Sequence, residues 1–226
     1  MGTGPALYAG LISIAVSTVL SMPISAVLMA IRTGAFSDPG SWVQAASSDV
    51  NAFKEMVENT EGSGASEILW RFVDMLFSAA MLEEGLKFLT CRIAIRKKGM
   101  VRTWMDAVIA FACVGITFEF VENIAFGMNA DLTEAIIWPL MPGHFVFGVI
   151  MGWFFGKYLV SGQKKYRVLS FVVPVLYHAL TNTLVGYPYI SIIIVFSYTA
   201  ATILILILII RWQKNGALNI PVKGAD

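Results

Sequence analysis

The chain contains several apolar runs of about 20 residues, and these runs constrain its fold more than any other feature. They lie at about 5–31, 104–128, 135–160, 168–187 and 189–211. Each can cross the roughly 30 Å hydrocarbon core of a bilayer as an α-helix, which satisfies its backbone polar groups internally. Charged residues make up only 14% of the chain, against roughly 25% in soluble domains. The sequence therefore predicts an all-α, polytopic membrane helix bundle that forms a single transmembrane domain over 1–226.

A sixth segment, about 67–91, carries charged side chains but is also expected to cross the membrane. The outer loop before it, about 32–66, is rich in acidic residues, and the loop after it is basic. With six crossings, most of the 16 Lys and Arg residues fall on one side, which the positive-inside rule makes cytoplasmic. We therefore expect about six transmembrane helices in the cell membrane, both termini in the cytoplasm, and a short helix over 49–59 in the outer loop.

His144 begins a series of residues spaced four apart in an apolar run, followed by Gly148, Gly152 and Gly156. Residues four apart share one face of a helix, and glycines on that face allow another helix to approach closely. His144 is therefore expected to point into the bundle. An ionisable side chain inside a membrane indicates function.

Further polar and ionisable residues fall inside the predicted spans. A charge at the centre of a membrane helix costs about 2.5–3.5 kcal/mol on insertion scales, so only a bundle interior can hold several of them. With His144, the residues concerned are Glu83, Glu84, Lys87, Glu119, Glu122, His178 and Asn182.

Glu83 and Lys87 are four apart and share a helix face, whereas Glu84 is turned from Glu83 by about 100°. The two acids therefore need not have the same role. A glutamate in an apolar environment beside an ammonium group can serve as a base near neutral pH. A Glu83–Lys87 pair that only neutralises itself is the alternative.

Two further pairs share helix faces. Glu119 and Glu122 form an acidic patch. The sequence leaves open whether these two acids are metal ligands, a proton-sharing pair or partners of Lys87 and Arg71. His178 and Asn182 are four apart and can donate hydrogen bonds to one point. A glutamate that takes a proton from water, a histidine that orients it, and a His/Asn pair that holds an oxyanion suffice for peptide hydrolysis without a covalent nucleophile.

Four motifs in this order on successive helices resemble the PrsW intramembrane protease family, within the wider group that includes the CAAX prenyl endopeptidases. The resemblance covers about 67–187, the predicted catalytic core. The motifs are Glu83-Glu84-x-x-Lys87, Phe118-x-x-x-Glu122-Asn123, Pro142-Gly-His144-x-x-x-Gly148 and His178-x-x-x-Asn182. Asn182 stands where many PrsW-like members are expected to carry Asp, and it matches the CAAX-protease pattern instead.

The resemblance implies a glutamate-dependent intramembrane endopeptidase. In this picture Glu83 is the general base and His144 helps to activate water. His178 with Asn182 stabilises the oxyanion, and Glu84 and Glu122 tune or support the site.

A metal-free mechanism without a cofactor is preferred, because the His/Asn pair suits oxyanion binding better than metal ligation. The alternative is a zinc-dependent version of the same protease, because PrsW-like proteins have also been classed as metallopeptidases. Its predicted ligands are Glu83, Glu122, His144 and His178.

The resemblance also implies partners. The expected substrate is another protein of the lipid bilayer, such as an anti-sigma factor or another single-span protein, and no nucleic acid is expected to bind. Two rival functions use the same residues differently. A proton-coupled transporter would relay protons through the acids and histidines, although no inverted repeat is evident. A catalytically silent scaffold would bind partners through the glycine series.

Overall fold

The computed structural model describes residues 3–34, 37–38, 40, 64–96, 100–128, 142–185, 188–216 and 220–222. The described chain forms the helices α1 (Gly4–Arg32), α4 (Ala65–Asp74), α5 (Met81–Ala94), α6 (Trp104–Gly127), α8 (Gly143–Ser161), α9 (Lys164–Leu184) and α10 (Pro188–Lys214). A π-helix, η1 (Met75–Ala80), joins α4 to α5. These residues contain no β-strand, so the all-α prediction is confirmed. The helix expected over 49–59 lies outside the described residues.

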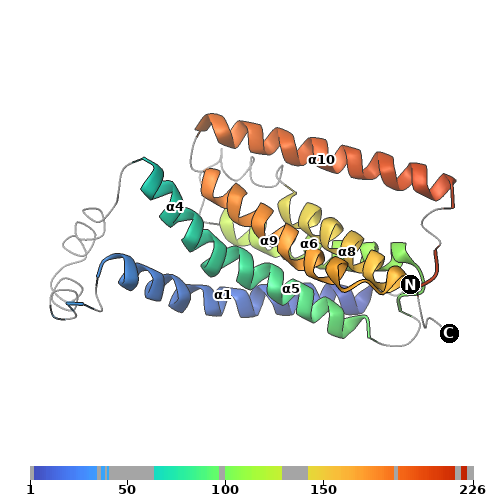
Figure 1. Ribbon diagram of the computed structural model, residues 1–226, viewed down its shortest axis with the longest axis horizontal. Coiled ribbons are helices and arrows are strands. Elements are labelled where there is room, and N and C mark those ends of the chain that lie inside the picture. Colours follow the sequence, from blue (N-terminus) through green and yellow to red (C-terminus); the bar gives the residue numbers. More distant parts are fainter. Residues whose placement is uncertain are drawn as a thin grey trace.

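The long helices pack side by side in a bundle, and α4, η1 and α5 together form one continuous helical rod of that bundle (Figure 1). Four described helices are long and apolar enough to cross a membrane: α1, α6, α8 and α10. The segment formed by α4, η1 and α5, and the helix α9, carry more polar side chains than these four helices. The structure is therefore an all-α membrane bundle, and the number of six crossings stays a prediction.

The glycine face of α8 packs closely against α6, as expected. A Cβ atom added at Gly148 would lie 2.5 Å from a backbone oxygen of α6. The same crowding occurs at Gly152 and Gly156. From the opposite side, Gly115 of α6 faces the backbone carbonyl of His144 so closely that a Cβ would collide with it. This contact holds His144 against the part of α6 that carries the acidic patch.

At one end of the bundle, α5, α8 and α10 end and α6 and α9 begin (Figure 1). The sequence at these helix ends is rich in basic residues and tryptophan. The ring of Trp153 stacks on Trp212 with centroids 4.4 Å apart, and its carbonyl accepts the indole N–H of Trp104 at 2.9 Å. The basic residues described there are Arg92, Arg96, Arg102, Lys157, Lys164, Lys165, Arg167, Arg211 and Lys214. Tryptophan and an excess of Lys and Arg are typical of a cytoplasmic membrane interface. This is the end predicted to face the cytoplasm.

Candidate active site

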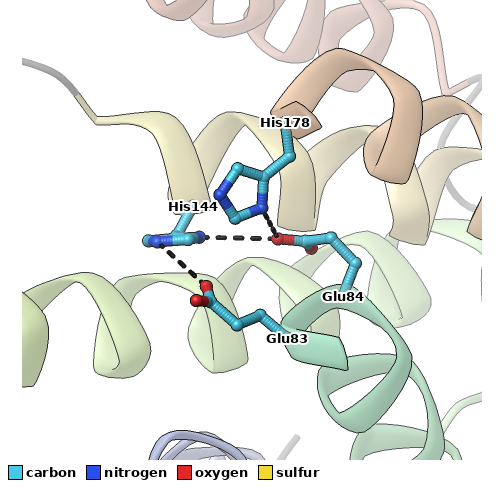
Figure 2. Close-up of side chains that lie close together, drawn as sticks. All are labelled: Glu83, Glu84, His144 and His178. Carbon is cyan, nitrogen blue, oxygen red and sulfur yellow. Dashed lines mark hydrogen bonds and ion pairs between the residues drawn. The ribbon is translucent and has the colours of Figure 1, made fainter. Parts of the chain in front are cut away.

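Four helices bring ionisable side chains together in the half of the bundle away from the tryptophans. Figure 2 shows the carboxyl groups of Glu83 and Glu84, from α5, turned toward the imidazoles of His144 and His178. Glu84 and His178 are 94 positions apart in the sequence, yet their side chains are in contact. The predicted convergence of remote residues is therefore present.

The π-helix η1 directly precedes the two acids. Its i→i+5 hydrogen bonds change the rotation of α5 relative to α4, and such segments are frequent at functional sites. Ala80, at its end, is fully buried and packs against Val175 and Ala179 of α9. This packing brings α5 and α9 close together near the acids. No feature of the sequence predicts the π-helix.

Glu84, rather than Glu83, is the partner of Lys87. The ammonium of Lys87 donates to Oε1 of Glu84 at 2.6 Å, and both side chains are buried. Nδ1 of His178 lies 3.0 Å from the same oxygen. The alternative of a self-neutralising Glu83–Lys87 pair is therefore wrong. Glu84 and Lys87 are three residues apart, a spacing that also places two side chains on one helix face. His178 of α9 then adds a second contact to Glu84.

His144 is held by contacts on three sides. Nδ1 lies 2.6 Å from the ammonium of Lys87, and Nε2 lies 2.6 Å from a carboxylate oxygen of Glu122. The backbone N–H of His144 donates to Glu119 at 2.7 Å. Because an ammonium can only donate, Nδ1 accepts, and Nε2 of the neutral ring carries the proton that it donates to Glu122. Oε2 of Glu83 is 3.8 Å from the same Nε2, beyond hydrogen-bond distance.

His178 and Asn182 lie on one helix face, as their spacing predicts, but they contact each other instead of both donating to one common point. Nδ2 of Asn182 lies 2.9 Å from Nε2 of His178, while Nδ1 of the ring faces Glu84. The imidazole also stacks on Phe147, with centroids 4.9 Å apart. When His178 donates to Glu84 and accepts from Asn182, the amide keeps one N–H for another acceptor.

A cavity of about 230 Å³ opens beside this cluster. The polar part of its wall includes Glu119, Glu122, Asn123, His144, His178 and Asn182. Glu83 and Glu84 are not part of the wall. Both histidines and Asn182 therefore face one cavity, whereas Glu83, which is expected to line the same cavity as the histidines, lies outside its wall.

Tyr198 of α10 is a site residue that the sequence analysis does not predict. Its side chain is buried, lines the cavity and donates a hydrogen bond to Oγ1 of Thr181 at 2.8 Å. The predicted catalytic core ends at 187, before this helix. A tyrosine inside an otherwise apolar run was the available signal. Through Tyr198 and Ile194, α10 forms one wall of the cavity.

Within the described residues, the side chains that could hold a metal ion are Glu83, Glu84, His144 and His178. One donor atom of each lies within 4.8 Å of the others. Glu84 takes the position expected for Glu122, which instead contacts His144. The donor types are those that zinc prefers, and Oε2 of Glu83 and of Glu84 are buried without a hydrogen-bond partner.

The position of Lys87 argues against a metal in this arrangement. Its ammonium is 2.6 Å from Oε1 of Glu84 and 2.6 Å from Nδ1 of His144. Two of the four donor residues thus already bind a cation, and like charges repel strongly where water does not screen them. The donor set as it is arranged does not fit a metal ion.

Comparisons with known proteins agree on one family. Residues 22–210 match the PrsW-protease family, described as "PrsW family intramembrane metalloprotease". The chain is 34% identical over 112 residues to Protease PrsW of Bacillus subtilis (strain 168), covering 47% of this chain and 51% of that protein. It is 30% identical over 136 residues to Protease PrsW of Geobacillus kaustophilus (strain HTA426), covering 58% and 59%. The chain spans about half the length of the curated relatives it matches. No solved structure matches the chain.

Proposed function

The chain belongs to the PrsW family of intramembrane proteases, and from this membership we propose that it is itself an intramembrane endopeptidase. It hydrolyses a peptide bond in or near the membrane segment of another protein of the cell membrane. The observation that carries the proposal is the meeting of two histidines, an asparagine and several acids beside one cavity inside an apolar bundle.

Glu83 is the proposed general base. Its Oε2 is buried and has no hydrogen-bond partner among the described residues, so a lone pair is available for a proton of the attacking water. Nε2 of His144 lies 3.8 Å from this oxygen, and its N–H, which Glu122 accepts in the structure, is the proposed group that turns to the water and orients it. Glu122 is the second carboxylate able to take the proton, since it lines the cavity and contacts the same nitrogen.

Asn182 is the proposed donor to the oxyanion. Attack of water on the scissile carbonyl places a negative charge on its oxygen, which a fixed N–H group stabilises more in the transition state than in the substrate. His178 holds the amide of Asn182 from one side, and Glu84 holds His178 in turn. The proton taken by the carboxylate then passes to the leaving amine, so no covalent intermediate is needed.

The cavity limits the form of the substrate. Its volume of about 230 Å³ is below the roughly 300–1,000 Å³ of pockets for drug-sized ligands. An intact helix, with a diameter of about 10–12 Å, needs more room. The substrate therefore unwinds locally at the cleavage site. The proposed substrates are single-span membrane proteins, and an anti-sigma factor is a suitable first candidate.

The experiment uses the purified protein in liposomes with a fluorogenic single-span substrate. Glu83→Gln and His144→Ala are expected to slow cleavage by at least about a hundredfold, while Leu204→Ala, on the exposed face of α10, leaves it intact. If both site variants cleave as fast as the parent, the proposal fails. Addition of a zinc chelator separates the two hydrolytic mechanisms, because the metal-free enzyme keeps its activity.

A further inference from the structure

Lys87 is buried at the centre of the site, with only 2% of the residue exposed. Its ammonium contacts a carboxylate oxygen of Glu84 and a ring nitrogen of His144, both at 2.6 Å. It also lies 4.0 Å from the centre of the Phe118 ring. These are three kinds of group that bind cations: an anion, an imidazole lone pair and an aromatic face.

The contacts of Lys87 overlap the potential metal site. Glu84 and His144 belong to the set of four residues whose donor atoms lie within 4.8 Å of one another. The ring nitrogen of His144 that faces Glu84, Nδ1, is the one that accepts from the ammonium. A metal ion bound through Oε1 of Glu84 and Nδ1 of His144 would have to displace the ammonium from both atoms, and the displaced charge would remain enclosed beside it.

We propose that the ammonium of Lys87 is the resident cation of this site and excludes a divalent metal ion from the four-residue cluster. This inference rests on the proposed metal-free peptidase and deepens it. The ammonium neutralises Glu84 and holds Nδ1 of His144 as an acceptor, so that Nε2 presents its proton to Glu122. A metal bound to His144 through Nδ1 would take the same lone pair.

The test is the zinc content of the purified protein, without an affinity tag, after equilibration with Zn²⁺ and removal of unbound ion. The parent is expected to retain less than about a tenth of a zinc ion per chain, because the fixed charge of Lys87 repels a second cation at short distance. Lys87→Met keeps the length of the side chain but removes its charge, and should retain about one zinc per chain. Lys87→Arg keeps the charge and should stay metal-free.

The control is Lys87→Met combined with His178→Ala, which should lose the zinc again if the ion binds in the cluster. Zinc retained by the parent at about one per chain, and lost in His178→Ala, overturns the inference. A folded Lys87→Met protein that stays metal-free also overturns it.

A second measurement covers the case in which Lys87→Met does not fold. An ion that binds the folded state raises the melting temperature as its concentration rises. Zn²⁺ should leave the melting temperature of the parent unchanged, and a rise that His178→Ala abolishes contradicts the inference. Metal content and cleavage are separate readouts. An inactive protein that excludes zinc refutes only the peptidase proposal. An active protein that retains zinc in the cluster refutes only the exclusion of metal by Lys87.

Discussion

Glu119 of α6 accepts the backbone N–H of His144 at 2.7 Å, so that an acid on one helix caps the first turn of another. The N–H of Phe145 reaches the same oxygen at 3.4 Å. The first N–H groups of a helix have no partner within it, and a carboxylate there also complements the helix dipole. The catalytic candidate His144 is thus fixed through its backbone as well as through its ring.

Glu119→Ala should therefore destabilise the protein by about 0.5–2 kcal/mol, the usual effect of losing a helix cap. Cleavage should also slow, because the start of α8 is no longer held. Glu119→Gln keeps an acceptor oxygen and should restore most of both properties. Thermal unfolding in detergent and cleavage rates of the same preparations check this, and an unchanged melting temperature in Glu119→Ala would show that the cap does not stabilise α8.

Glu83→Gln should reduce kcat by about 10²–10⁴-fold, the usual contribution of a general base. The amide has nearly the shape of the carboxylate but cannot take a proton from water. Glu122→Gln should have a smaller effect, because the amide oxygen can still accept from Nε2 of His144. Single-turnover rates on one substrate compare the two variants, and the reverse order would assign the base to Glu122.

Asn182→Ala should reduce kcat by about 10²–10³-fold, as expected for the loss of one oxyanion donor. KM should change little, because the contact strengthens only in the transition state. Asn123→Ala, on α6, alters the wall of the same cavity and serves as the matched control. A rise in KM alone for Asn182→Ala would mean that the amide binds the substrate rather than the oxyanion.

Gly148→Ala should lower the stability of the bundle, because the new methyl group would lie 2.5 Å from the carbonyl oxygen of Phe111. The helices must then move apart or bend, and overpacking of this kind typically costs about 1–3 kcal/mol. Gly127→Ala, in α6, is the control, since a Cβ there meets nothing within 4 Å. Melting temperatures of the two variants should separate clearly, and equal values would show that the α6–α8 contact tolerates a wider spacing.

Helix periodicity was sufficient to predict which residues of α8 and α9 face the interior. The spacing of four in His144, Gly148 and Gly152 corresponds to one packed face, and His178 with Asn182 to another. These predictions succeed because one helix alone determines which of its residues share a face.

Partners across helices could not be predicted in the same way. Lys87 can share a face with a residue three or four positions away, so periodicity does not choose between Glu84 and Glu83. The choice depends on His178, which contacts Glu84 from α9. Similarly, the place of Tyr198 in the cavity wall depends on how α10 packs against α9.

The π-helix η1 changes the rotation of α5 relative to α4, and this has a consequence for how the site could vary. Each residue of an α-helix turns the chain by about 100°, so a single-residue deletion within Met75–Ala80 should rotate α4 against α5. Buried contacts anchor Glu84 and Lys87, whereas α4 has no buried residue, so α4 is the part expected to turn. Arg71 would leave the cavity wall while the carboxylates kept their places. The wall of the cavity and the arrangement of the carboxylates can therefore change independently through the length of one short segment.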